Sequence, residues 1–136
     1  MPQFSRRSLD RLDTCHPALR TLMHAAIRHV DFTVLCGIRT DEEQAELFRQ
    51  GRSQLDGASK RSKHQARPDG YSWAVDVAPC PIDWQNAARF THLAGFIRGL
   101  AAASGIEVRW GGDWDGDGEL TDNRWNDLPH IELVKP

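Results

Sequence analysis

Two short segments, far apart in the chain, carry side chains that could together bind a metal ion. The first segment contains His64 and Asp76, and the second contains Asp127 and His130. Two imidazoles and one carboxylate are a common ligand set for catalytic Zn²⁺, because they leave the fourth tetrahedral position free for a water molecule. His64, Asp76 and His130 could supply that set, and Asp127 would remain as a base. The predicted chemistry is metal-assisted amide hydrolysis.

The surrounding pattern matters, because a histidine on its own is weak evidence for a metal site. The chain has six histidines, and four of them look like surface or helix residues. His64 and Asp76, however, occur in a Ser-x-His and Ala-x-Asp frame, and His130 occurs in an Asp-x-x-His-x-Glu frame. We expect His64 just before one strand, Asp76 on that strand and His130 at the start of the last strand. The three side chains converge only if these strands are neighbours in a sheet.

These motifs resemble those of a zinc peptidase family that groups D-Ala-D-Ala carboxypeptidases and dipeptidases with the L-alanyl-D-glutamate endopeptidases of bacteriophage endolysins. The resemblance covers nearly the whole chain and is strongest to the endolysins. It implies that His64, Asp76 and His130 bind zinc and that Asp127 is the catalytic acid and base. The aspartate at position 127 resembles the residue found in the endolysin branch. The D-Ala-D-Ala enzymes typically have glutamate at this position. That difference favours cleavage inside the peptidoglycan stem peptide.

A further motif of the family is matched by residues 37–40, Gly-Ile-Arg-Thr. The resemblance implies that Arg39 holds a substrate carboxylate or stabilises the developing oxyanion, where a fixed positive charge is effective. The alternative for Arg39 is a surface ion pair. Gln44 and Ser62 are further candidates for substrate binding, although the Ser62 hydroxyl could simply shape its loop.

The interval between the first two candidate ligands departs from the family pattern. Eleven residues separate His64 from Asp76, which is longer than in the family motif. We expect this insertion to enlarge the loop over the cleft, where it would alter specificity more readily than zinc binding.

Residues 113–120 repeat the first half of a calcium-binding loop. Asp113, Asp115 and Asp117 place oxygen donors at positions 1, 3 and 5, and glycine follows at position 6. Position 12 is Arg124, where an EF-hand has a bidentate glutamate, so Asp122 or another acid would have to complete the shell. Oxygen ligands favour Ca²⁺ over Zn²⁺, and similar acidic loops occur in some endolysins of this type. We therefore predict a weak or irregular calcium site that regulates activity; the alternative is a solvated acidic turn.

Length and composition predict one compact domain. The chain has 136 residues, of which 40% are hydrophobic, and a formal net charge of −2. This size suits a single catalytic domain over residues 1–136, and the mixed charge gives no reason to expect nucleic acid or an anionic membrane as a partner. Three cysteines without CxxC spacing, Cys15, Cys36 and Cys80, predict buried free thiols rather than disulfides or a cysteine zinc site.

Targeting signals are not evident in the sequence. No segment approaches the ~18 to 20 apolar residues of a membrane span, and the start has no apolar stretch after its arginines. We therefore expect accumulation in the host cytoplasm without a signal peptide, and action on the periplasmic cell wall after release through a holin or similar route. We expect a monomer.

Helices are predicted from apolar periodicity and capping. Apolar residues recur at three-to-four spacing over residues 17–30 and again over 87–101, the second run ending at Gly105. Residues 40–43 form a capping box that opens another helix, and Gly51 would close it. These segments predict three helices with one face toward the core.

Strands are expected where β-branched and apolar residues are concentrated, at 32–36, 73–77, 106–110 and 130–134, with long loops at 52–72 and 111–126. Helices and strands without strict alternation favour an α+β fold, with a small antiparallel sheet and flanking helices. Five tryptophans could line a cleft or fill the core, and we expect the core for Trp73, Trp84, Trp110, Trp114 and Trp125.

Three functions are compatible with these observations. The first is a zinc-dependent L-alanyl-D-glutamate endopeptidase that cuts peptidoglycan stem peptides and releases phage from a bacterial host. The second is a D-Ala-D-Ala carboxypeptidase or dipeptidase. The third is a non-catalytic cell-wall-binding module with structural zinc or calcium, but a structural zinc site normally has four protein ligands. The endopeptidase accounts best for Asp127.

Overall fold

The computed structural model describes residues 1–121, 123 and 125–135. Asp122 and Arg124, which fall in the predicted calcium loop, lie outside these described residues.

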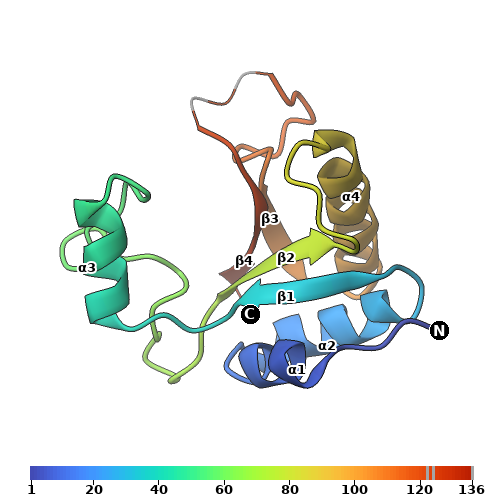
Figure 1. Ribbon diagram of the computed structural model, residues 1–136, viewed down its shortest axis with the longest axis horizontal. Coiled ribbons are helices and arrows are strands. Elements are labelled where there is room, and N and C mark those ends of the chain that lie inside the picture. The colour runs from blue at the N-terminus through green and yellow to red at the C-terminus, as the bar shows by residue number, and fades with distance from the viewer. Residues whose placement is uncertain (122, 124, 136) are drawn as a thin grey trace.

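Four helices and four strands are formed by the described residues (Figure 1). The helices are α1 (Arg6–Leu12), α2 (Pro17–Ile27), α3 (Asp41–Arg49) and α4 (Ala87–Ala103). The strands are β1 (Phe32–Cys36), β2 (Ala74–Pro79), β3 (Glu107–Gly111) and β4 (Asp127–Lys135). They form one antiparallel sheet in the order β1-β2-β4-β3. The prediction of an α+β fold with a small antiparallel sheet is confirmed.

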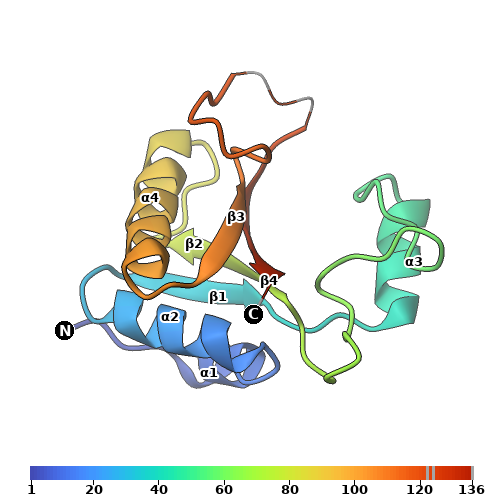
Figure 2. The ribbon, with the colours of Figure 1, turned by 180° about the vertical axis from the view of Figure 1, so that it is seen from behind.

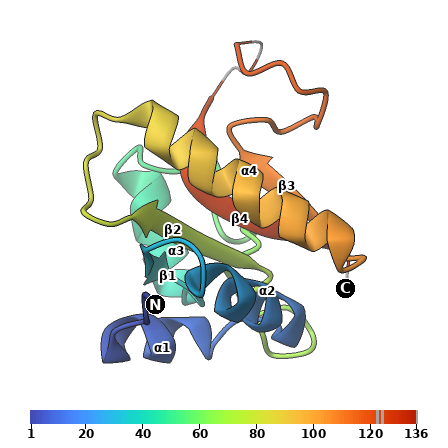
Figure 3. The ribbon, with the colours of Figure 1, turned by 90° about the vertical axis from the view of Figure 1, so that its right-hand side faces the viewer.

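The helices are divided between the two sides of the sheet. Helix α4 contacts β2, β3 and β4, and it also packs against α2, so these two helices build one layer. Figures 1 and 2 show α3 on the opposite side of the sheet from α4. Figure 3 shows α4 in front of the sheet with α3 behind it. Helix α3 and the loop after it therefore form an arm that faces the sheet from the side without α2 and α4.

The core lies between the sheet and the layer of α2 and α4. The apolar periodicity of both helices is directed into it, which confirms the predicted core faces. Burial of such side chains is the main favourable contribution to folding, at roughly 25 cal/mol per Å² of apolar surface. The fully buried members include Leu19, Met23, Val34, Val75, Ile97, Ile131 and Leu133.

Local capping explains where α3 begins and ends. The Thr40 side chain accepts from the Glu43 backbone N–H at 3.0 Å, and the Glu43 carboxylate accepts from the Thr40 N–H at 3.0 Å. This is the predicted capping box. The helix ends just before Gly51, whose φ of 73° is a left-handed conformation that glycine adopts without strain. Both predicted ends of this helix are confirmed.

Two elements differ from the sequence-based expectation. Helix α1 was not expected, because it buries only Ser8 and Leu12 and so has no apolar stripe to reveal it. Strand β4 begins at Asp127 rather than at His130. Its first residue pairs with Gly111, where an added Cβ would lie 2.0 Å from the Asp127 carbonyl oxygen. Only glycine at position 111 allows the two strands to approach this closely.

No helix among the described residues is long and apolar enough to cross a bilayer.

Candidate metal centre and catalytic site

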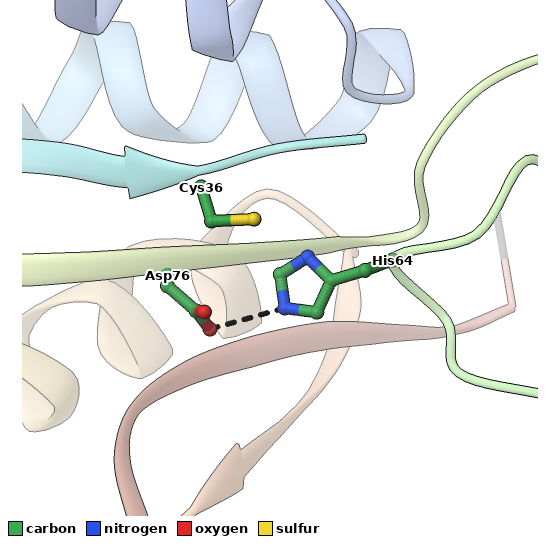
Figure 4. Close-up of side chains that lie close together, drawn as sticks. All are labelled: Cys36, His64 and Asp76. Atoms are coloured by element: carbon green, nitrogen blue, oxygen red, sulfur yellow. Dashed lines mark hydrogen bonds and ion pairs between the residues drawn. The ribbon is translucent and has the colours of Figure 1, made fainter. Parts of the chain in front are cut away.

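Strand pairing brings the three candidate ligands together. Asp76 on β2 is the direct antiparallel partner of His130 on β4. His64 reaches the same point from the loop before β2, and its Nε2 lies 3.1 Å from Asp76 Oδ1 (Figure 4). The Nδ1 of His130 lies 3.3 Å from the same oxygen. Residues that are far apart in the sequence thus share one site because β2 and β4 are neighbours.

The donor set fits a zinc ion. Two imidazole nitrogens and a carboxylate oxygen are ligands that Zn²⁺ accepts, at about 2.0–2.2 Å each. Tetrahedral coordination at those lengths separates neighbouring ligand atoms by about 3.3 Å. The two distances to Asp76 Oδ1, 3.1 Å and 3.3 Å, match that separation, and among the described residues His64 and His130 belong to two groups of close donor atoms that share Asp76. His64, Asp76 and His130 would hold the ion.

Hydrogen bonds on the far side of each imidazole orient the two rings. His64 Nδ1 lies 2.8 Å from the Gly37 carbonyl oxygen, so it donates there and leaves Nε2 free for a metal. His130 Nε2 lies 2.8 Å from Glu132 Oε1, which leaves Nδ1 free in the same way. The Lys63 ammonium lies 3.1 Å from the second oxygen of Glu132. Such outer partners fix the tautomer of a ligand and raise its basicity.

Replacing Glu132 with glutamine should therefore weaken zinc binding. We expect the dissociation constant for zinc to rise about 10- to 100-fold, because His130 loses the carboxylate that orients it. Competition with a chromophoric chelator measures the constant directly. Glu107→Gln, an exposed change on β3, is the matched control. Equal zinc affinity in the Glu132 variant and the wild type would contradict this role for Glu132.

The electrostatics of the site distinguish its two aspartates. Burial alone would raise the pKa of Asp76, but His64 and His130 act more strongly together and hold it well below its usual range. Burial raises the pKa of Asp127, and the negative charge of Asp76 adds to that effect. Asp76 is thus suited to remain an ionised ligand. Asp127 is a better proton acceptor than an ordinary aspartate.

Asp127 lies beside the candidate ligands without replacing them. Its Oδ2 is 3.9 Å from His130 Nδ1, and its carboxylate lies within 4.8 Å of the ligand atoms of Asp76 and His130. About a third of its side chain is exposed, at 31%, so it can reach a water molecule or a substrate. This is the geometry expected of a general base next to a metal.

Arg39, Gln44 and Ser62 occupy different positions around this centre. The Arg39 guanidinium lies 3.8 Å from Asp76 Oδ2, and its Nη1 donates to Gln44 Oε1 at 2.8 Å. Gln44 is fully buried and also donates to Ser53 and Leu55. The structure therefore favours a positioning role for Gln44, through Arg39, over direct contact with a substrate.

Ser62 is nearly buried, and its hydroxyl accepts from the His64 backbone N–H at 3.1 Å. It shapes the loop that carries His64, although it also lines the cleft described next.

A cleft of about 510 Å³ opens onto the candidate metal centre. The α3 arm forms one wall, and the sheet together with the acidic loop forms the other. Its lining includes the metal centre and the arm, at Arg39, Leu47, residues 52–55, residues 61–64, Asp76, Asp127, His130 and Glu132. Trp114 and Trp125 complete the second wall. The volume is that of a typical small-molecule or peptide site.

The placement of the tryptophans corrects the sequence-based expectation. Trp110 is buried in the core as predicted, but Trp84 and Trp125 are largely exposed. The Trp114 and Trp125 rings stack with an interplanar angle of 4°, and Trp114 lies 5.5 Å from the His130 ring. The sequence does not distinguish a cleft tryptophan from a core tryptophan here, because Trp110 on β3 and Trp114 just after β3 are only four positions apart.

The insertion before β2 also lies elsewhere than expected. None of the described residues from 65 to 73 lines the cleft. Tyr71 and Trp73 instead pack edge-on against His16 at the start of α2, and Arg67 lies over the Trp73 ring. The added residues attach the loop to α2, so the expectation that they extend over the cleft is wrong.

The cysteines were expected to be buried thiols, and this holds fully only for Cys15. Burial raises the pKa of Cys15 to about 12. Cys36 and Cys80 are half-buried, and all three are free. Figure 4 shows Cys36 on β1 beside His64 and Asp76. Its Sγ lies 3.8 Å from the Arg39 guanidinium, so it belongs to the surroundings of the metal centre, which the sequence did not indicate.

The acidic loop brings its first three aspartates together. One carboxylate oxygen of each of Asp113, Asp115 and Asp117 lies within 4.8 Å of the others. Asp113 is fully buried, and its Oδ2 accepts from the Gly118 N–H at 3.0 Å and faces Arg98 at 3.3 Å. Its Oδ1 has no hydrogen-bond partner among the described residues. A buried oxygen without a hydrogen-bond partner destabilises the folded state unless a cation or a water molecule in the loop contacts it.

Comparison with known proteins identifies relatives over most of the chain. A family model described as phage L-alanyl-D-glutamate peptidase matches residues 1–134. The L-alanyl-D-glutamate peptidase of Escherichia phage T5 is 31% identical, over 97% of this chain and 98% of that protein. The peptidoglycan L-alanyl-D-glutamate endopeptidase CwlK of Bacillus subtilis is 24% identical, over 81% of this chain and 65% of CwlK.

A solved structure is similar over nearly the whole fold. The crystal structure of the L-Ala D-Glu endopeptidase ChiX from Serratia marcescens superposes with a TM-score of 0.75 at 30% identity. The match covers 97% of this chain and 90% of ChiX. The chain therefore belongs to the phage L-alanyl-D-glutamate peptidase family.

Proposed function

We propose that this protein is a zinc-dependent L-alanyl-D-glutamate endopeptidase that cleaves peptidoglycan stem peptides. The convergence of His64, Asp76 and His130, with Asp127 beside them in an open cleft, carries the proposal. The names of the relatives in phage T5, B. subtilis and S. marcescens support the same bond specificity. We propose that residues 1–136 act as one catalytic domain.

The chemistry follows from the positions of the side chains. Zinc, when bound, supplies a Lewis acid that acidifies a water molecule and polarises the scissile carbonyl. Asp127 accepts the proton of the attacking water and delivers it to the leaving amine of D-glutamate. Arg39, held by Gln44, stabilises negative charge that develops on the substrate or holds its carboxylate. His64 and His130 are kept in their ligand tautomers by Gly37 and Glu132.

We further propose a role in host lysis as a phage endolysin. The match to the phage peptidase family supports this role. The protein would accumulate in the host cytoplasm and reach the periplasmic wall through a holin or a similar route. Peptidoglycan would be its partner, and it would act as a monomer.

The alternative within enzymes is a D-Ala-D-Ala carboxypeptidase or dipeptidase. Two synthetic substrates separate the two activities: free D-Ala-D-Ala, and a stem tripeptide beginning with L-Ala and D-Glu. We expect the zinc-loaded protein to release L-alanine from the tripeptide and to leave the dipeptide intact. Cleavage of the dipeptide alone would replace the endopeptidase proposal with the alternative.

We also propose that the acidic loop binds calcium and regulates the site. The unpartnered Oδ1 of Asp113 and the gathered carboxylates support this proposal. A backbone N–H from Asp117 favours the ionised form of Asp115, yet desolvation and the neighbouring carboxylates raise its pKa. A divalent cation would relieve that repulsion. Trp114, between two of these aspartates, faces His130 and would transmit the change to the metal centre.

The calcium proposal predicts a defined loss in one variant. Asp115→Asn should raise the calcium dissociation constant at least about tenfold, because an exposed charged ligand is lost while the buried Asp113 stays intact. Tryptophan fluorescence, reported by Trp114 and Trp125, follows the titration. Asp83→Asn, an exposed change in another loop, should bind calcium as the wild type does. If the wild type binds no calcium at millimolar concentrations, the calcium proposal is wrong and the acidic loop is a solvated turn.

A further inference from the structure

The two walls of the cleft differ in charge. The sheet wall presents carboxylates that belong to the metal centre and its support. The α3 wall, with the loop that leads to His64, presents four cations. They are Arg39, Arg52, Arg61 and Lys63. A cleft with this arrangement favours a substrate that carries negative charge on the α3 side.

Three of the four cations are already engaged by carboxylates of the protein. The pairs are Arg39 with Asp76 at 3.8 Å, Lys63 with Glu132 at 3.1 Å and Arg61 with Asp41 at 3.2 Å. Arg39 and Lys63 are further tied to the metal centre through those partners. These three side chains therefore already form ion pairs within the protein when no substrate is bound.

Arg52 differs from the other three cations. Its guanidinium has no carboxylate partner among the described residues, and its one side-chain hydrogen bond among them goes to Gln50 Oε1, at 3.4 Å. Its backbone is nevertheless fixed, because the Arg52 N–H donates to the Leu47 carbonyl at 2.9 Å just after α3. A guanidinium is a planar donor that matches a carboxylate with two parallel hydrogen bonds. An exposed arginine without a carboxylate partner among the described residues, on the wall of the cleft, is suited to bind a carboxylate of the substrate.

We propose that Arg52 forms a second carboxylate subsite, which selects stem peptides whose third residue carries a free, non-amidated carboxylate. This inference rests on the proposed endopeptidase function. Arg39 lies against Asp76 at the metal centre, so it is placed for the D-glutamate next to the scissile bond. The next carboxylate along the leaving peptide belongs to the diaminopimelate that follows. The γ-linkage of D-glutamate places that group further from the scissile bond than one α-linked residue would, and Arg52 lines the same cleft as Arg39.

A pair of synthetic peptides tests the inference. Both contain L-alanine, γ-linked D-glutamate and diaminopimelate, and they differ only in whether the side-chain carboxylate of diaminopimelate is free or amidated. We expect the wild type to prefer the free form about twofold to fivefold in kcat/KM, as one exposed ion pair allows. The difference should fall on KM, because this contact is made equally in the ground state and the transition state.

Three variants make the test specific. Arg52→Gln should lose the preference, and Arg52→Lys should recover part of it, since a lysine keeps the charge but not the planar fork. Arg49→Gln is the matched control, because Arg49 is on α3, pairs with Glu46 and does not line the cleft. It should retain the wild-type preference.

The outcomes separate this inference from the proposed function. Cleavage of both peptides with equal efficiency by the wild type, or an undiminished preference in Arg52→Gln, would overturn the carboxylate subsite and leave the endopeptidase standing. Failure of the zinc-loaded wild type to cleave either peptide would overturn both.

Discussion

Replacing Asp127 with asparagine should lower kcat/KM for stem-peptide cleavage about 100- to 10,000-fold, the range that a general base contributes. Asparagine keeps the size of the side chain but does not accept a proton from water. Asp127 lies 3.9 Å from His130 and is not needed to complete the ligand set of His64, Asp76 and His130. The variant should therefore fold and retain zinc, and the loss should fall mainly on kcat.

Three measurements separate a lost base from a damaged site. Zinc content by elemental analysis and the thermal unfolding midpoint should match the wild type, while hydrolysis is lost. Asp10→Asn, an exposed change on α1, is the control for the substitution itself. Full activity in Asp127→Asn would contradict the assignment of the base. A non-catalytic wall-binding module would be indifferent to the substitution, so the variant also tests that alternative.

Removing the metal should abolish hydrolysis and lower the thermal stability of the protein. A ligand that binds only the folded state stabilises it by about 4 kcal/mol when present at 1,000 times its dissociation constant. We therefore expect a chelator to lower the unfolding midpoint and added Zn²⁺ to restore both midpoint and activity. His64→Ala should behave like the chelated protein, and His92→Ala, an exposed change on α4, should behave like the wild type.

The same experiment has a defined pH dependence. Burial opposes protonation of His64, but Asp76 outweighs it and raises the pKa of His64 to about 10; the pKa of His130 is raised as well. Below these pKa values the metal-free imidazoles carry protons, which zinc must displace to bind. The zinc affinity should thus fall as the pH is lowered. Activity that survives complete removal of zinc at any pH would contradict a metal-dependent mechanism.

Local signals in the sequence were sufficient for much of the scaffold. The capping box at Thr40 and Glu43 and the glycine at position 51 predicted α3, because each of these features acts within a few residues. The apolar periodicity of α2 and α4 predicted the faces that pack in the core. Helix α1 escaped notice, because its only buried residues are Ser8 and Leu12.

The candidate site was predicted in its parts rather than in its geometry. The motifs around His64, Asp76 and His130 indicated the candidate ligands, but the approach of these side chains depends on the pairing of Asp76 with His130 across β2 and β4. The sequence around either residue does not indicate which distant strand it will pair with. The sequence also does not show why position 111 must be glycine, because that requirement arises only from its close approach to Asp127 on the neighbouring strand.

Residues whose role depends on three-dimensional neighbours were the ones misjudged. Trp125 was expected in the core, but it lines the cleft because the acidic loop folds back toward β4. The insertion was expected over the cleft, but Tyr71 and Trp73 find aromatic contacts with His16 instead. In each case the contacts that place the side chain are made with residues of another segment, Trp114 for Trp125 and His16 for Tyr71 and Trp73, and the sequence pattern does not show them.

Digestion of purified Gram-negative peptidoglycan shows whether the protein is a zinc-dependent L-alanyl-D-glutamate endopeptidase. Wild type and Asp127→Asn, both loaded with zinc, are incubated with intact sacculi, with and without calcium, and the new termini are identified by mass spectrometry. We expect new N-terminal D-glutamyl ends, made by the wild type and reduced to background in the variant. No new D-glutamyl ends from well-folded, zinc-loaded wild type under either condition would contradict it.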